Sequence, residues 1–176
     1  MALNINFKTN TNTIQQKFRK FKAVLPRVID KGIGQAGFQL LDIIKTKTKK
    51  GIDYNDIPFA PYSQGYIKRL QKEGKPTKVD LYYSGRMLGS LTPNQAITKT
   101  GKHKITLGFA RAEERDKALF NQVLREPKRK FFMFNKRTEN IIKKQFAKFV
   151  EKELRKFKIW VLEKISHQTY YQLFLV

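Results

Sequence analysis

The stretch from Pro58 to Leu91 is the feature that most limits how this chain can fold. It places prolines, glycines and helix-capping residues so close together that it can hold only short elements on a defined path. Ser63 is a good N-cap for a short helix from Gln64 to about Glu73, which Gly74 would end. Ser84 is expected to cap a second short helix. We therefore interpret this stretch as a rigid connector between the segments on either side of it.

The segment before the connector has the periodicity of helices. From Thr11 to Leu25, apolar residues recur every three or four positions. Pro26 interrupts this pattern and is expected to start a second helix. That helix is expected to end at Gly51, after a run of lysines that suits a helix C-terminus. Three glycines close together within it predict a close approach to another element: Gly32, Gly34 and Gly37.

The segment after the connector predicts a β-hairpin over residues 95–110. Ile105, Leu107 and Phe109 alternate with polar or small residues, as in a half-buried strand. The residues before Thr100 would supply the partner strand. His103 lies at the turn, where we expect it to be a solvent-exposed turn residue and not a ligand.

The remainder of the chain is expected to be mainly helical. Residues 111–124 predict a short helix, and an apolar stripe from about Lys136 onward predicts a long one with Asn135 as its N-cap. Between these helices, residues 131–134 are expected to form a short buried strand or plug. The last residues, from Trp160 to Val176, change from helical spacing to an apolar, β-like sequence.

Together these patterns predict a single α+β domain over residues 1–158. Long N- and C-terminal helices would pack on a small antiparallel β-sheet, with short helices in the central connector. Residues 159–176 would form a C-terminal extension that docks on the domain or on a neighbouring subunit, because an exposed apolar end is a liability for a free monomer.

The chain is strongly basic, with 37 Lys and Arg residues against 14 Asp and Glu and a formal charge of +23. Such an excess attracts polyanions, so nucleic acid and acidic partner proteins are both candidate partners. The positive excess is nine charges in residues 1–50 and eleven in residues 101–176, but only three in residues 51–100. The connector is therefore not expected to be a nucleic-acid contact.

The basic flanks are the candidate contact surfaces. The lysine run from Lys45 to Lys50 is open to two interpretations, a nucleic-acid contact or a solvated helix end that complements the helix dipole. The absence of interleaved aromatic residues that would stack on bases favours the second. The candidate basic contact surface comprises Lys45, Lys47, Lys49, Lys50, Lys128, Arg129, Lys130, Lys143 and Lys144.

The sequence offers little for catalysis. It has no cysteine, only two histidines, and no glycine-rich phosphate loop. Asp53 and Asp56 form the closest carboxylate pair, and in a loop bounded by glycine and proline such residues usually bond their own backbone. We therefore expect no enzyme activity, no cofactor and no metal. The sequence also lacks a signal peptide pattern and any run long enough for a membrane helix, so we expect a protein that is intracellular or assembled inside a cell, without membrane contact.

The order of residues in the connector resembles that of the virion morphogenesis and tail-completion proteins of tailed bacteriophages. In that family a W/F-x-P-L-S segment precedes a basic helix ending in glycine, and an L-v-D-T-G-R-L-x-x-S-I segment and a hairpin follow. The resemblance covers roughly residues 50–135. The positions that match the family pattern are Phe59, Pro61, Ser63, Gly74, Leu81, Ser84, Gly85, Arg86, Leu88 and Ser90.

This resemblance implies a structural virion protein in the neck of a phage particle, assembled in the host cytoplasm. Its subunits would form a homo-oligomeric ring, a hexamer or dodecamer, that joins the portal or an adaptor ring to tail proteins. Non-specific contact with DNA in the channel is possible in such a position. Arg86 would either anchor the connector, through bidentate hydrogen bonds to a carboxylate or to backbone carbonyls, or lie on the surface.

The chain departs from the family pattern after the hairpin. Residues 120–122 and 127–132 stand where the family has a His-Gln-Phe-Gly-like and a Pro-x-Arg-Pro-Phe segment, without that glycine or the second proline. The alternative function, a basic nucleic-acid-binding protein, depends on the charge of +23 alone.

Overall fold

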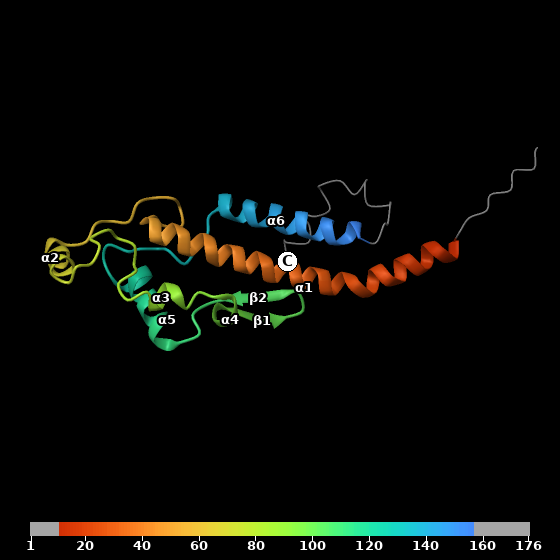
Figure 1. The fold of residues 1–176 in the computed structure, drawn as a ribbon, viewed down its shortest axis with the longest axis horizontal. Coiled ribbons are helices and arrows are strands. Elements are labelled where there is room, and N and C mark those ends of the chain that lie inside the picture. The colour runs from red at the N-terminus through yellow and green to blue at the C-terminus, as the bar shows by residue number, and fades with distance from the viewer. Residues whose placement is uncertain (1–10, 157–176) are drawn as a thin grey trace, which may run out of the picture.

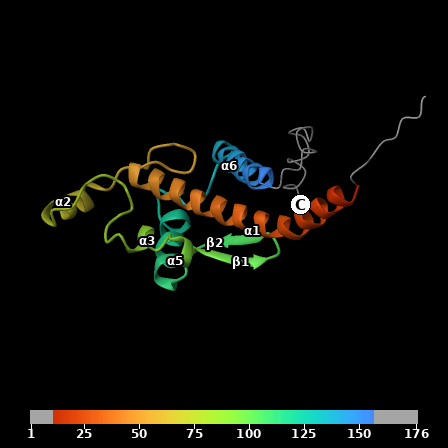
Figure 2. The same ribbon diagram turned by 45° about the vertical axis from the view of Figure 1, so that its right-hand side comes forward.

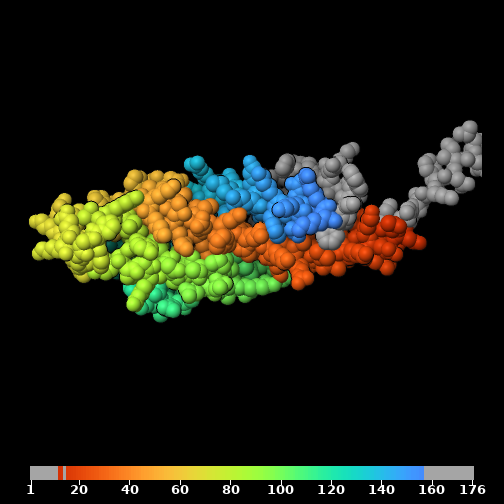
Figure 3. All heavy atoms as spheres, viewed as in Figure 1, coloured from red at the N-terminus to blue at the C-terminus, as the bar shows by residue number. Residues whose placement is uncertain are grey.

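The structure of the protein is a computed structural model that describes residues 11–156. Its described atoms form an elongated body with α2 at one end and the first turns of α1 at the other (Figure 3). Helix α1 (Thr11–Lys50) is the long axis of this body. Helix α6 (Lys136–Arg155) lies along one side of α1, and the hairpin of β1 (Ile97–Gly101) and β2 (Lys104–Leu107) lies on the other (Figures 1 and 2).

Helix α1 is one continuous helix of 40 residues, about 60 Å long by the rise of an α-helix. The prediction that Pro26 separates two helices is wrong, because Pro26 lies inside α1. Proline removes one intrahelical hydrogen bond, but its side chain is exposed here, where water can reach the freed carbonyl. On the opposite side Val28 is buried against α6, and this packing spans the proline. The predicted end at Gly51 is confirmed, since Gly51 has a φ of +80°.

The glycines of α1 make the predicted close approaches at two of three positions. A Cβ added at Gly32 would lie 2.8 Å from the ring of Phe146 and 3.0 Å from that of Phe149, both in α6. A Cβ at Gly37 would overlap the side chain of Ile105 in β2. Gly34 faces open space. Glycine therefore lets α6 and the hairpin reach the α1 backbone from different sides.

The predicted hairpin is confirmed. Its antiparallel register pairs Ile97 with Leu107, and the ladder is irregular between Lys99 and Gly101. His103 occupies the turn with a φ of +56°, but it is not the solvent-exposed residue expected. Its Nδ1 atom lies 2.8 Å from a carboxylate oxygen of Asp30 in α1, and Lys99 Nζ lies 2.6 Å from the other oxygen. These contacts lower the pKa of Asp30, the Lys99 contact most, and fix the hairpin tip to α1.

The connector holds short helices, as predicted, but one cap differs. Helix α2 (Gln64–Lys72) begins after Ser63, whose Oγ accepts a hydrogen bond from the Tyr66 amide at 3.4 Å. Helix α3 (Arg86–Gly89) has Gly85 as its N-cap, with no side-chain hydrogen bond, so the expected capping role of Ser84 is wrong. Gly85 has a φ of +72°, and a Cβ there would lie 2.9 Å from the ring of Tyr82. The backbone turns through a conformation that glycine alone adopts easily. Helix α4 (Pro93–Ala96) then leads into β1.

The predicted helix over residues 111–124 is present as α5 (Ala112–Leu119) followed by a π-helical turn, η1 (Phe120–Leu124). Residues 131–134 form no strand; Phe131 alone is fully buried, and it packs on Phe109 with ring centroids 6.5 Å apart. The predicted cap of α6 is confirmed, because Asn135 Oδ1 accepts from the Thr138 amide at 2.9 Å.

Two clusters of buried residues form the core, and α1 contributes to both. The larger lies among α1, the connector, α5 and Phe131, and it includes Leu41, Ile44, Leu88 and Leu91. The smaller lies between α1 and α6 and consists of Val28, Val150 and Leu154. The α+β class is confirmed. Of the two long helices expected to pack on the sheet, α1 lies against the hairpin, whereas the main partner of α6 is α1. The predicted docking of residues 159–176 lies outside the described residues.

The glycine contacts make a matched pair of substitutions informative. Gly32→Ala should lower the free energy of unfolding by about 1–2 kcal/mol, because the rings of Phe146 and Phe149 must move and this cost exceeds the gain in helix propensity. Gly34→Ala, a little over half a turn away, should raise the free energy of unfolding by up to about 1 kcal/mol. Urea denaturation followed by circular dichroism measures both. Equal effects of the two substitutions would contradict the close approach at Gly32.

Candidate contact surfaces

The ten residues that match the connector pattern divide into buried and exposed groups. Phe59, Leu88 and Ser90 are buried, and Ser90 Oγ donates to the Met87 carbonyl at 2.8 Å. Gly74 and Gly85 take positive φ values, and so does Leu81 at +54°. Pro61, Ser63, Ser84 and Arg86 are exposed. The pattern therefore fixes the path of the connector and leaves polar groups on its surface.

Of the two roles considered for Arg86, an anchor of the connector or a surface residue, the structure agrees with the surface residue, because the side chain is exposed. Within residues 11–156 it makes no ion pair or side-chain hydrogen bond. The nearby Glu113 has a lowered pKa, caused first by its contact with Lys117 and to a smaller extent by the charge of Arg86. Arg86 is thus a free cation on the rim of the connector.

The predicted basic surface is only partly available for contacts. Lys49, Lys50, Lys128, Lys130 and Lys144 are exposed, and Lys45 is half-buried. Lys47 is engaged within the chain, since its Nζ lies 2.8 Å from Asp56 and donates to the Tyr54 carbonyl at 3.1 Å. Lys143 pairs with Glu139 at 2.6 Å.

Arg129 does not belong to this surface, because its side chain is 0% exposed. Its Nη2 donates to the carbonyls of Ala60 at 3.1 Å and Pro61 at 3.3 Å. The guanidinium lies over the ring of Tyr62, 4.9 Å from the centroid. Arg129 therefore ties the segment before α6 to the connector, while its two lysine neighbours in sequence point to solvent.

Aromatic residues lie close to the exposed lysines, although none is interleaved with them in sequence. Lys49 Nζ lies 5.2 Å from the ring centroid of Tyr82, which comes from the connector. Tyr82 and Tyr83 are both about half exposed, at 48% and 47%. The end of α1 thus combines cations with aromatic rings, which weakens the argument that favoured a merely solvated helix end.

An exposed apolar surface on α5 and η1 is the feature that sequence reasoning missed most clearly. It consists of Leu119, Phe120, Val123 and Leu124, whose exposed fractions run from 47% to 66%. We call it the α5–η1 apolar surface. Clustered exposed apolar side chains mark contact sites in soluble proteins. The only signal in the sequence is the density of apolar residues after Lys117, which a core helix would show equally well.

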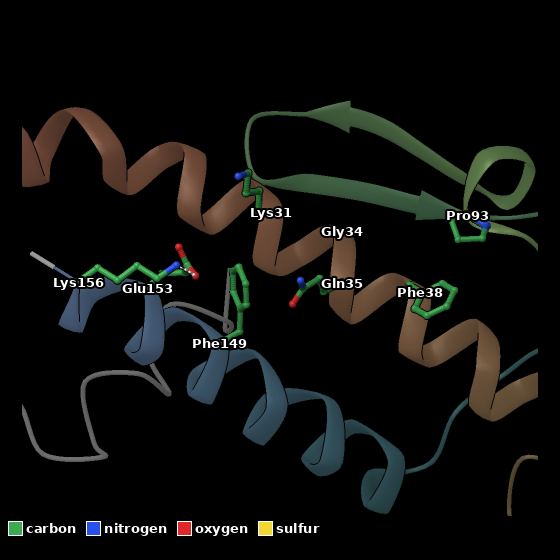
Figure 4. Close-up of a pocket in the computed structure, with 8 residues that line it drawn as sticks. All are labelled: Lys31, Gly34, Gln35, Phe38, Pro93, Phe149, Glu153 and Lys156. Carbon is green, nitrogen blue, oxygen red and sulfur yellow. Dashed lines mark hydrogen bonds and ion pairs between the residues drawn. The ribbon is translucent and has the colours of Figure 1, made fainter.

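Two hollows lie beside α1. Each is lined by residues of α1, of α6 and of the hairpin or the short helix before it. One, of about 660 Å³, is shown in Figure 4; Phe149 of α6 points toward α1 there, and Phe38 lines the hollow farther along α1. Phe38 is 52% exposed there. The other, which we call the apolar groove, has a volume of about 700 Å³. It lies among α1, β2, residues 132–134 and α6, and its lining includes Ile33, Leu40, Leu107, Phe134 and Phe146.

A charged cluster at the connector joins α2 to the loop after it. Glu73 accepts hydrogen bonds from Arg69 Nε and from the Tyr83 hydroxyl, both at 2.8 Å, and lies 3.0 Å from Lys75 Nζ. These contacts, that of Arg69 first, lower the pKa of Glu73 to about 2. Lys75 Nζ also lies 3.3 Å from the ring centroid of Tyr83. The cluster holds α2 against the connector.

The loop carboxylates bond within the chain. Asp53 Oδ1 accepts from the amides of Asn55 at 2.8 Å and Ile57 at 2.9 Å, which confirms its interpretation as a turn former. Asp56 instead pairs with Lys47. Across residues 11–156, no group of three or more His, Cys, Asp and Glu side chains could hold a metal ion. None of the helices described is both long and apolar enough to cross a membrane.

The cluster around Glu73 predicts a pH-dependent contribution to stability. Because its folded pKa is depressed from an ordinary value of 4.5 to about 2, Glu73 stabilises the fold above pH 4.5 and loses this effect as the pH falls toward 2. Glu73→Gln should therefore be less stable than the parent protein at pH 6, and the difference should vanish near pH 2. Urea denaturation between these values measures it. Glu151→Gln on the exposed face of α6 is the control, and a Glu73→Gln difference that persists at pH 2 would contradict this role.

Comparison of the chain with models of protein families, with curated proteins and with solved structures finds no match in any of the three. The likeness to tail-completion proteins therefore stands on the connector residues alone. Their geometry is that of a fixed loop path next to exposed polar and apolar surfaces.

Proposed function

We propose that this chain is a structural subunit of the neck of a tailed bacteriophage, where a ring of its copies joins the portal to the tail. One observation carries the proposal. The chain has an exposed apolar surface on α5 and η1 and a separate apolar groove along α1, made by different elements. Two complementary surfaces at different places on one subunit form head-to-tail contacts, and such contacts close into rings or extend into filaments.

The connector supports the same proposal. Its pattern residues bury Phe59 and Leu88 and place glycines where the chain must turn, so the sequence likeness coincides with a defined loop path. The body is elongated, so that α2 at one end, the first turns of α1 at the other end, and the sides between them are separate surfaces (Figure 3). Such a subunit offers separate contacts for ring neighbours, for a portal or adaptor ring and for tail proteins. The exposed lysines suit acidic partner rings, with non-specific contacts to DNA in the channel.

A specific observation favours the alternative, a basic nucleic-acid-binding protein. The exposed Lys49 at the end of α1 lies near the ring of Tyr82, Lys75 lies over the ring of Tyr83, and the chain carries +23 charges. Cations beside aromatic rings bind single-stranded nucleic acid, and basic surfaces bind duplexes. Binding to a fluorescent oligonucleotide over a range of salt concentrations tests this function. A dedicated binder retains tight binding at physiological salt, whereas a neck subunit should bind only at low salt and without sequence preference.

The ring proposal predicts self-association through the α5–η1 apolar surface. The purified protein should elute as a hexamer or dodecamer in size-exclusion chromatography with light scattering, and should appear as rings by negative-stain electron microscopy. The double variant Phe120→Asp and Leu124→Asp should be monomeric with an unchanged midpoint of thermal unfolding, because both side chains are exposed in the subunit.

Ile57→Asp is the matched control, since Ile57 is 57% exposed but lies outside both apolar surfaces. It should assemble as the parent protein does. A parent protein that stays monomeric at its highest soluble concentration would contradict the ring proposal. Assembly that Ile57→Asp and the double variant disrupt equally would contradict the assigned surface.

A further inference from the structure

A cleft of about 530 Å³ lies between the connector and the α5–η1 segment. Cations reach it from three places: Arg86 of α3, Lys117 of α5 and Arg125 just after η1. The connector supplies Tyr62, Tyr66 and Tyr83 to the opposite wall. No Asp or Glu lines the cleft. Lys117 pairs with Glu113, so Arg86 and Arg125 are the cations left without a carboxylate among the described residues.

Guanidinium donors in and behind this cleft lack acceptors. Arg125 Nε is buried and has no hydrogen-bond partner within residues 11–156. The same is true of Nε and Nη1 of Arg129, which is wholly buried behind Tyr62. Its neighbour Arg125 is close enough to repel it, and the pKa of Arg129 is lowered by burial first and by Arg125 second. Two guanidinium groups thus lie together with donors unsatisfied.

Buried guanidinium donors without acceptors lower the free energy of unfolding of the isolated subunit. A buried charge normally has an opposite charge or a full set of hydrogen bonds, because leaving water is otherwise unfavourable. Oxyanions meet this need, since carboxylates and phosphates accept several hydrogen bonds from arginine at once. Among the described residues no carboxylate lines the cleft, so the cleft is complementary to a negative group from outside this part of the chain.

We propose that this cleft binds an oxyanion, and that its occupant is the carboxylate of an acidic side chain on a partner protein. A side chain can project into a recessed cleft lined by Arg86 and Arg125, whereas the phosphates of duplex DNA lie on the outside of a wide rod. The α5–η1 apolar surface begins at the mouth of the cleft, where Arg125 lies 6.0 Å from the ring centroid of Phe120. The matching partner segment therefore carries an Asp or Glu flanked by apolar residues. This inference does not depend on the ring proposal, because one subunit supplies all the donors.

The test uses the full chain with two small probes, glutarate as the carboxylate and inorganic phosphate, each titrated at constant ionic strength with chloride. Arginine Nε–H signals are followed by NMR, with those of Arg125 and Arg129 assigned through the variants Arg125→Gln and Arg129→Met. Glutarate should shift both signals saturably. Arg125→Gln should weaken glutarate binding about tenfold, as the loss of a charged hydrogen bond does.

Arg115→Gln is the matched control, because it removes the same charge from α5 at a side chain that is 66% exposed. It should bind glutarate as the parent protein does. Arg129→Met, which removes the buried charge, should stay folded by circular dichroism and lose the glutarate-induced rise in unfolding temperature.

Three outcomes would overturn the inference. Shifts that are unsaturable, or equal in Arg125→Gln and Arg115→Gln, would mean general screening of a basic chain. Unshifted Nε–H signals for Arg125 and Arg129 would mean that water or the aromatic rings already satisfy them. Saturable binding of phosphate that is about tenfold tighter than that of glutarate would replace the partner carboxylate with a phosphate group.

Discussion

The close contact of α1 with neighbours on two sides is the constraint on which the rest of the structure depends. Phenylalanine rings of α6 press on Gly32, and Ile105 of the hairpin presses on Gly37. A helix can be approached so closely only where it carries no side chain, so two glycines five positions apart allow two separate elements to dock on one rod. The larger core then forms where the connector closes over the C-terminal half of α1. Without these approaches, the two-stranded hairpin would have little surface on which to pack.

The elements themselves follow from local sequence, and the exceptions have physical reasons. Caps at Ser63 and Asn135, the hairpin alternation and the apolar stripe of α6 are short-range signals, and the structure agrees with each. Pro26 misleads because the packing of Val28 and its neighbours against α6 outweighs one lost hydrogen bond. Ser84 misleads because Gly85 takes the capping position, where a left-handed backbone conformation is required.

The contact surfaces were harder to predict, because burial depends on residues distant in sequence. Arg129 lies between two exposed lysines, and only the ring of Tyr62 and the carbonyls of residues 60 and 61 distinguish it from them. Likewise, the apolar residues of η1 have the composition of a core helix, and only the absence of a covering element in the described structure makes them a surface. Charge counts gave the sign of the surface but not its location. Which lysines are free depends on tertiary pairs such as Lys47 with Asp56.

The uneven support along α1 has a mechanical consequence. Residues 15–20 of this helix are exposed throughout, whereas its second half is enclosed by the hairpin, the connector and α6. Helix α1 is therefore held by its neighbours over part of its length and extends beyond them at its N-terminal end. A force applied to the exposed residues 15–20 becomes a torque on the supported part of the helix. Pro26, where the helix lacks a hydrogen bond, lies inside that supported part, because Phe21 before it and Val28 after it both pack in the cluster with α6.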